Sequence, residues 1–114
     1  MVKIEFARGD NYDRGFLIKD RSTGQTVTEP YDEIYFTVKR NAVEHDFLFQ
    51  KRLSTGGIVS DGEGHYTLHI SPEDTNNLSF GEYDCDIEVM KNGSKKTFYG
   101  QLKLCREVTH QYNE

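Results

Sequence analysis

The dipeptide Asn92-Gly93 joins two segments in which apolar and polar residues alternate, and it constrains the fold more than any other feature of the sequence. Both residues tolerate the positive φ angle of a type I′ turn, so the pattern predicts a β-hairpin over residues 81–109. With a two-residue loop, Tyr83 faces Leu102 across the hairpin. A shift of one residue would place charged side chains on the apolar face, so the turn and the alternation predict the same register.

The predicted register sorts the side chains of the hairpin onto two faces. Cys85 lies on the apolar face, whereas Cys105 alternates with Leu104 and lies on the opposite one, so we expect free thiols rather than a disulfide. Free thiols are typical of a reducing compartment. We expect Cys85 to be buried and inert, and Cys105 to be exposed with no clear base beside it. The apolar face carries Tyr83, Cys85, Ile87, Val89, Phe98, Leu102 and Leu104.

Alternating apolar residues predict five more strands ahead of the hairpin. Residues 25–32 contain Pro30 and are expected to connect two strands or to form an edge. Seven short strands without a sustained helical period predict an all-β antiparallel sandwich. The five strands are expected at 2–6, 15–19, 33–40, 47–53 and 66–70.

One short helical turn is expected near residues 72–78. Ser71 is a favourable N-cap, Pro72 suits the first helical position, and Asp74 stands three residues after the cap. Since the pattern covers about one turn, we expect a corner between two strands rather than a longer helix.

Length and charge limit the domain organisation and the classes of partner. We expect one domain over residues 1–109 and a frayed tail over 110–114. The net charge is −5, with 14 basic residues dispersed among 19 acidic ones, which argues against nucleic acid and against an anionic membrane surface. No apolar run approaches the roughly 20 residues of a transmembrane helix, and the first residues do not form a signal peptide. We therefore expect the protein in a cytoplasm or in something assembled there.

A row of carboxylates, formed by Asp84, Asp86 and Glu88, falls on the outer face of the predicted hairpin, with Asp61 and Glu63 in a loop nearby in sequence. Hard cations prefer such ligands, so a calcium site is one interpretation. The other is a charged row that keeps an exposed sheet face soluble and discourages edge pairing. Because the spacing matches no known calcium loop, we expect no metal and no cofactor, with the row as weak candidates.

The histidines do not form a second metal site in the sequence. His65 and His69 lie on a predicted strand, where four residues span about 13 Å, too far to share one zinc ion. His45 and His110 fall in a loop and in the tail, and we expect all four to be solvated. Since no Ser, Cys or His lies in a recognisable catalytic motif, we expect no enzymatic activity.

The start of the hairpin, Gly81-x-Tyr83-x-Cys85, resembles the start of strand F in immunoglobulin domains. The resemblance implies that Gly81 and Tyr83 are structural residues and that the Tyr83 hydroxyl bonds to backbone upstream. The disulfide of those domains is not expected here, because the candidate partner strand 15–19 has no Cys, and the chain has no Trp.

A wider resemblance covers nearly the whole chain, and its most specific part is Pro72-Glu-Asp-Thr75, Leu78 and Gly81-x-Tyr83-Asp84-x-Asp86-Ile87. The chain resembles the small immunoglobulin-like β-sandwich of bacteriophage and prophage structural proteins, including the N-terminal domain of upper baseplate proteins in phages of Gram-positive bacteria. That resemblance implies a virion or tail-assembly module that contacts other phage proteins, or itself, through sheet edges and loops. It transfers no catalytic residue. The remaining matching residues are Asp20, Gly24, 34–40, Gly64, Tyr66, Ile70, Ser71, Gly100, Val108 and Thr109.

Two other functions are consistent with the sequence. One is recognition of a host surface glycan through exposed tyrosines, which pair an apolar face with a hydrogen-bonding tip. Tyrosine is also common on strands for reasons of β-propensity alone. The second is a calcium-dependent domain that uses the carboxylate row. The candidate glycan-binding residues are Tyr12, Tyr31, Tyr35 and Tyr99.

Overall fold

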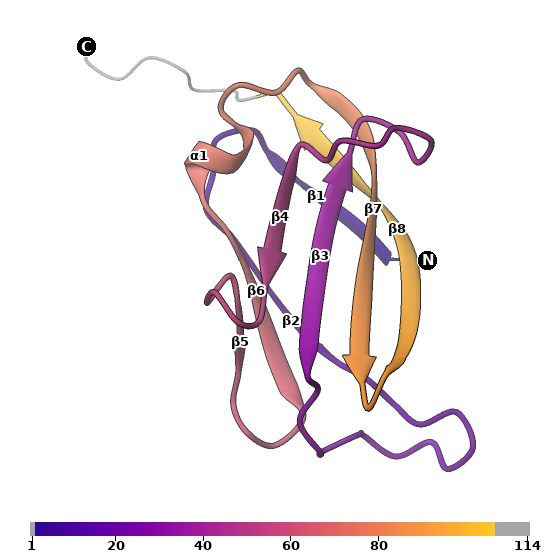
Figure 1. Cartoon of the computed structure of the whole chain (residues 1–114). Coiled ribbons are helices and arrows are strands. Elements are labelled where there is room, and N and C mark those ends of the chain that lie inside the picture. The colour runs from indigo at the N-terminus through magenta and orange to yellow at the C-terminus, as the bar shows by residue number, and fades with distance from the viewer. Residues whose placement is uncertain (1, 107–114) are drawn as a thin grey trace.

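The computed structural model describes residues 2–106, which form eight strands and one helical turn (Figure 1). The expected domain end at 109, the tail 110–114 and the motif residues Val108 and Thr109 lie outside the described residues. The elements are β1 (Val2–Ala7), β2 (Tyr12–Leu17), β3 (Glu33–Lys39), β4 (Phe49–Arg52), β5 (Ile58–Ser60), β6 (His65–Ile70), α1 (Pro72–Thr75), β7 (Gly81–Lys91) and β8 (Ser94–Cys105).

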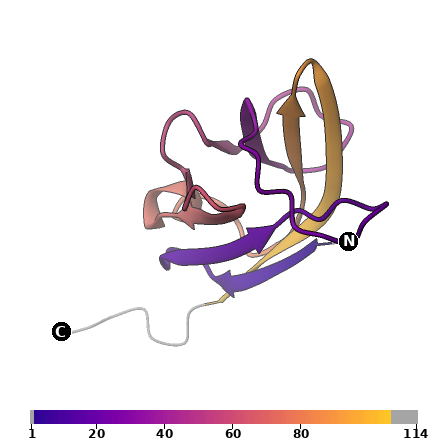
Figure 2. The ribbon, with the colours of Figure 1, turned by 90° about the horizontal axis from the view of Figure 1, so that it is seen from below.

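The strands form two sheets that pack face to face. One sheet has the order β1-β8-β7-β3-β4 and the other the order β2-β6-β5. Immunoglobulin domains likewise place strands B, E and D in one sheet and C, F and G in the other, which correspond here to β2-β6-β5 and β3-β7-β8. The predicted fold class, an all-β immunoglobulin-like sandwich, is confirmed. Figure 2 shows β1 (indigo) beside β2 (purple), which follows it in the chain but belongs to the other sheet.

The hairpin has the predicted register. Tyr83 pairs with Leu102 and Cys85 with Gly100, and the ladder continues to the turn. Asn92 and Gly93 adopt φ angles of 52° and 82°, as a type I′ turn requires. Alternation in the sequence and the turn therefore do specify one pairing.

Some expected strands have other bounds, and one strand was missed. β2 begins three residues earlier than expected, at Tyr12, and ends at Leu17. β4 begins at Phe49, and Phe47 lies outside it with half of its surface exposed. The missed strand is β5, which has three residues and a single buried side chain, Ile58. It is too short to produce a recognisable alternation.

The pairing of β1 with β8 is parallel, whereas the other strand pairs are antiparallel. Val2 lies opposite Gly100, and an added Cβ at Gly100 would collide with the Val2 carbonyl oxygen. Glycine therefore allows the two backbones to approach closely at this point. This one pair departs from the predicted antiparallel arrangement, because its partners are almost the full chain apart and local alternation carries no information on their direction.

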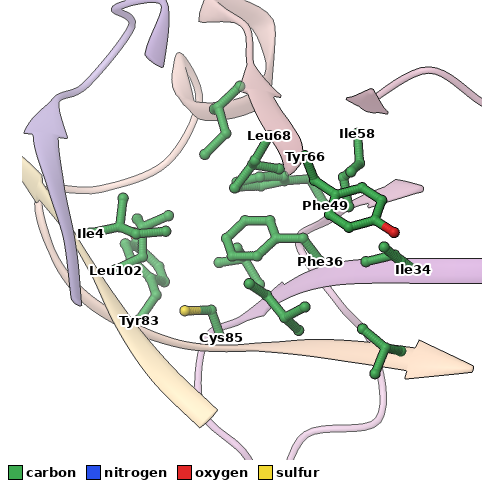
Figure 3. Packing of buried hydrophobic residues seen from close by; sticks show 14 of the residues in the cluster. Ile4, Ile34, Phe36, Phe49, Ile58, Tyr66, Leu68, Tyr83, Cys85 and Leu102 are labelled. Carbon is green, nitrogen blue, oxygen red and sulfur yellow. The ribbon is translucent and has the colours of Figure 1, made fainter. Parts of the chain in front are cut away.

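The core lies between the two sheets (Figure 3). Phe36 is fully buried at its centre, and its ring packs on Phe49 with centroids 6.3 Å apart. β7 and β8 contribute alternate residues, as the register requires. The buried apolar residues are Ile4, Ile18, Ile34, Phe36, Val38, Phe49, Ile58, Tyr66, Leu68, Ile70, Tyr83, Cys85, Ile87, Val89, Leu102 and Leu104.

Two corners before β7 have the expected structure. The backbone N–H and the hydroxyl of Ser71 both donate to Asp74 Oδ2, at 2.8 and 3.0 Å, and hold the single turn α1 that starts at Pro72. The Tyr83 hydroxyl donates to the Ser79 carbonyl oxygen at 2.6 Å, which forms the predicted tyrosine corner. Gly81 adopts a φ angle of 133°, which only glycine adopts readily.

Candidate functional site

The outer face of the five-stranded sheet brings together polar residues from three neighbouring strands. In one row, Gln101 of β8 lies opposite Asp84 of β7, which lies opposite Lys39 of β3. In the next row, the same strands place Tyr99, Asp86 and Thr37 side by side. These side chains share one face because each pair is separated by two residues along its strand.

These two rows border a hollow of about 350 Å³ on the sheet surface. The loop that follows β3 closes one end, where the Ala42 N–H donates to Asp84 Oδ2 at 2.8 Å. Tyr99 forms a side wall and is 69% exposed. An aromatic ring lined up with carboxylates, an amide and an ammonium group around one hollow can bind a small ligand that has both an apolar face and polar groups.

The carboxylate row lies on this outer face as predicted, but its members have different surroundings. Asp84 accepts the bond from Ala42. Asp86 Oδ1 is buried and has no hydrogen-bond partner among the described residues. Burial and then the nearby Glu88 charge raise the pKa of Asp86, while Lys39 and Lys95 act in the opposite direction.

A metal site is not assembled from the row. Among residues 2–106, no three His, Cys, Asp or Glu side chains are grouped as metal ligands. Asp61 belongs to the β5–β6 loop of the other sheet, where Oδ1 accepts the N–H groups of Glu63 and His65 at 2.7 and 3.1 Å. The Glu63 N–H bond is the largest cause that lowers the pKa of Asp61. The acidic residues that were considered as one calcium site therefore lie in two separate places, the outer face of the hairpin and the β5–β6 loop.

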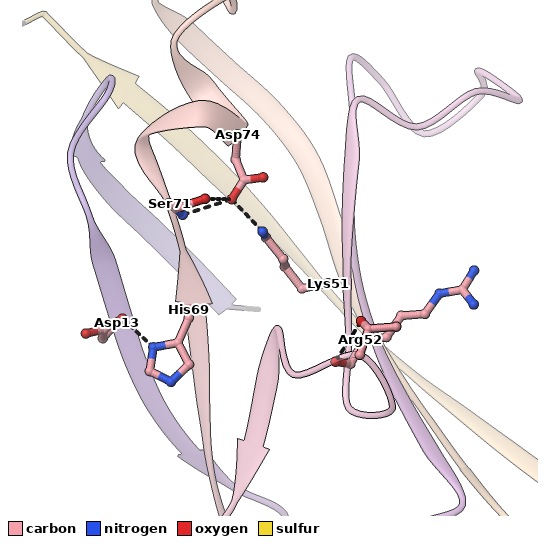
Figure 4. A network of polar contacts seen from close by, with 7 residues as sticks. Asp13, Lys51, Arg52, His69, Ser71 and Asp74 are labelled. Carbon is pink, nitrogen blue, oxygen red and sulfur yellow. Dashed lines mark hydrogen bonds and ion pairs between the residues drawn. The ribbon is translucent and has the colours of Figure 1, made fainter.

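Two of the histidines each lie beside a carboxylate. His65 Nδ1 is 3.2 Å from Asp61 Oδ2, and His69 Nδ1 is 2.6 Å from Asp13 Oδ1 (Figure 4). Both rings are about half exposed. Each histidine faces its own acidic partner, so the pair does not converge on one point; His110 lies outside the described residues.

The cysteines lie on opposite faces and are not bonded to each other. Burial raises the pKa of Cys85 to about 12, with a further contribution from the Asp86 and Asp84 charges, so its thiol stays protonated. Cys105 has a neighbour that the sequence did not suggest: its thiol donates to Glu5 Oε2 at 3.4 Å. Burial and that bond raise its pKa, which disfavours the nucleophilic thiolate.

The four tyrosines proposed for glycan contact are not equally available. Tyr12 stacks on Phe6 with ring centroids 4.7 Å apart, and Tyr31 packs against the core. The Arg52 guanidinium lies 5.1 Å from the ring centre of Tyr35. Of the four, Tyr99 alone is largely exposed, so the expectation of an exposed set was wrong for the other three.

The loop between β3 and β4 presents apolar side chains to solvent. Val43 is 88% exposed and Phe47 is 50% exposed. The loop backbone is held in place, because Asn41 Oδ1 accepts the Val43 N–H at 3.1 Å and Asp84 accepts the Ala42 N–H. The sequence did not reveal this surface, since Phe47 alternates with Phe49 and was expected in a buried strand.

Three of the four edge strands, β1, β4 and β5, are short or partly blocked. β5 and β4 have three and four residues, and Arg14 Nη1 donates to the Lys3 carbonyl oxygen on the edge strand β1 at 3.0 Å. On β4, the Lys51 side chain points between the sheets, where its Nζ lies 2.6 Å from Asp74 Oδ2 (Figure 4). Short strands and inward-pointing charges on an edge disfavour pairing with another strand. The fourth edge strand is β2, which has six residues.

Comparisons with known proteins identify a fold and no family. No family model matches the chain, and no curated protein matches it. Among solved structures, the chain is similar to the endo-beta-1,4-mannanase from Thermotoga petrophila, with a TM-score of 0.57 and 16% identity. The match covers 92% of this chain but only 18% of the mannanase chain. The likeness at this identity is one of fold. No described helix is both long and apolar enough to cross a membrane.

Proposed function

We propose that this domain is a non-catalytic assembly module that binds another protein through the loop 41–48. The observation that carries the proposal is the pair of exposed apolar side chains, Val43 and Phe47, on one loop. Two large apolar side chains exposed on one loop are a candidate protein-binding surface. The Ala42 and Val43 N–H groups donate hydrogen bonds to Asp84 and Asn41 and hold this part of the loop before any partner arrives, which reduces the entropy lost on binding.

We place this module in a phage or prophage particle, as a tail, baseplate or connector component. The support is the resemblance in sequence described above, whose most specific residues are corner, turn and core positions. Such residues define a scaffold and leave the loops free to vary with the partner. The partner is then another structural protein of the particle or a second copy of this chain.

The experiment is size-exclusion chromatography with light scattering, on the protein alone and mixed with the products of neighbouring genes. We expect a homo-oligomer or a complex with one of those products. Val43→Ser combined with Phe47→Ser should abolish it, because both side chains lose their apolar contact. Val59→Ser is the matched control, since Val59 is 47% exposed on the other sheet.

Two results would contradict the proposal. One is a strict monomer that binds none of the neighbouring products. The other is a complex that the double variant forms as well as the wild type, which would move the contact away from this loop. Thermal melting of each variant shows whether it is folded, and a change at an exposed loop should alter stability by less than about 0.5 kcal/mol.

A further inference from the structure

The hollow on the outer face combines the exposed ring of Tyr99 with both hydrogen-bond donors and hydrogen-bond acceptors. Tyr99, Asp86 and Thr37 form one row across three strands, and neighbouring strands lie about 4.8 Å apart. The side walls are thus about 10 Å apart, with the carboxylates between them. Tyr99 and Gln101 border one side, and Lys39 and Thr37 the other.

The polar groups of the hollow leave acceptor capacity unused. Asp84 accepts one bond, from the Ala42 N–H, and a carboxylate can accept about four. Asp86 Oδ1 has no partner among the described residues, so a small rotation of this carboxylate would let a donor in the hollow satisfy it. Lys39 and Gln101 add donors on either side. A ligand that carries several hydroxyl groups matches this mixture.

The net charge of the lining and the volume of the hollow restrict the class of ligand further. Two carboxylates and one ammonium group give the lining a net negative charge, which disfavours anions. The volume of about 350 Å³ is near the lower end of the roughly 300–1,000 Å³ of ligand pockets, which suits one ring better than an extended molecule. The exposed face of Tyr99 can stack on the apolar C–H face of a sugar.

We propose that this hollow binds one neutral or amino-bearing pyranose ring of a glycan, stacked on Tyr99 and hydrogen-bonded to Asp84, Asp86 and Gln101. The site is separate from the apolar side chains of the proposed protein contact, although Ala42 of the same loop closes the hollow. Each proposal can fail alone, because Val43 and Phe47 do not line the hollow.

The test is a titration followed by two-dimensional amide NMR on the whole protein. The probes are cellotetraose, mannotetraose, chitotetraose and the deacetylated glucosamine tetramer, with sialyllactose as an anionic comparison. We expect one of the four neutral or amino probes to bind in the millimolar range or tighter. Its shifts should centre on Lys39, Asp86, Tyr99 and Gln101, and sialyllactose should leave them unchanged.

Tyr99→Ala should weaken binding at least tenfold, because it removes the stacking ring. Tyr35→Ala is the matched control, since Tyr35 lies on the same sheet face but does not line the hollow. If Tyr99→Ala does not fold, Tyr99→Thr removes the ring while keeping a residue favoured in strands. The proposal is overturned if none of the four probes shifts residues of the hollow, or if the Tyr99 variants bind as well as Tyr35→Ala.

Discussion

The inner and outer faces of the β7–β8 hairpin come from the same two strands but have different roles. On the inner face, Tyr83, Ile87 and Val89 are at most 9% exposed and pack in the core. On the outer face, the intervening Asp84 and Asp86 are charged residues beside an open hollow. Strand alternation thus commits one face to stability and leaves the other available for binding at little cost to the fold.

Two tyrosines of the hairpin make the same contrast. Tyr83 is 5% exposed and its hydroxyl is bonded to Ser79, whereas Tyr99 is 69% exposed with its ring beside the hollow. The role of a tyrosine in this hairpin therefore depends more on the face on which it lies than on its residue type.

The largest effect is expected from Leu102→Ala. Leu102 is fully buried, so truncation removes apolar contacts and leaves a cavity. The cost should be about 2–5 kcal/mol in the free energy of unfolding, measured by urea denaturation. Its neighbour on the opposite face supplies the control: Gln101→Ala should change stability by less than about 0.5 kcal/mol. Equal costs for the two variants would contradict the division between the faces.

An intermediate effect is expected from Tyr83→Phe. The change keeps the buried ring and removes the hydrogen bond to the Ser79 carbonyl, which should cost about 0.5–1.5 kcal/mol in the same measurement. Tyr99→Phe removes a hydroxyl from the exposed ring and should leave stability unchanged. If both variants match the wild type, the corner bond does not contribute to the fold.

The smallest effect is expected from Asp86→Asn. The folded protein raises the pKa of Asp86 from its usual value of 3.8, because burial and Glu88 disfavour the charged form. Folding therefore favours the protonated form, and stability from this group falls as the pH rises above 3.8 through the raised pKa. Asn removes that cost, so its melting temperature should exceed that of the wild type at pH 7 by a few degrees at most, since the group is partly exposed. Below pH 3.8 the difference should vanish. A variant less stable than the wild type at pH 7 would contradict the assignment.

Much of the fold could be predicted because its strongest signals are local. Asn92 and Gly93 set the turn, and the alternation on either side set which face is buried. The capping residues Ser71 and Asp74 and the corner residue Tyr83 also act within a few positions of their partners. The turn and the capping residues were recognisable from their spacing, and the corner residue from the resemblance to immunoglobulin domains.

Features that depend on distant parts of the chain were not predictable in the same way. β2 was misplaced because Arg14 interrupts its apolar alternation, and Arg14 is used there to reach the Lys3 carbonyl of β1. The carboxylate row was correctly placed on the outer face. The hollow beside it, however, depends on the loop carrying Ala42 and on the pairing of β3 with β7, and no motif encodes either contact.

One register divides the hairpin into a face that holds the fold and a face that does not. An alanine scan of β7 from Glu82 to Val89, with the free energy of unfolding measured for each variant, is the direct test of this division. We predict an alternation of period two: losses above about 1 kcal/mol at Tyr83, Ile87 and Val89, and changes within about 0.5 kcal/mol at the even-numbered positions. Losses without alternation, or the largest losses at Asp84 and Asp86, would contradict it.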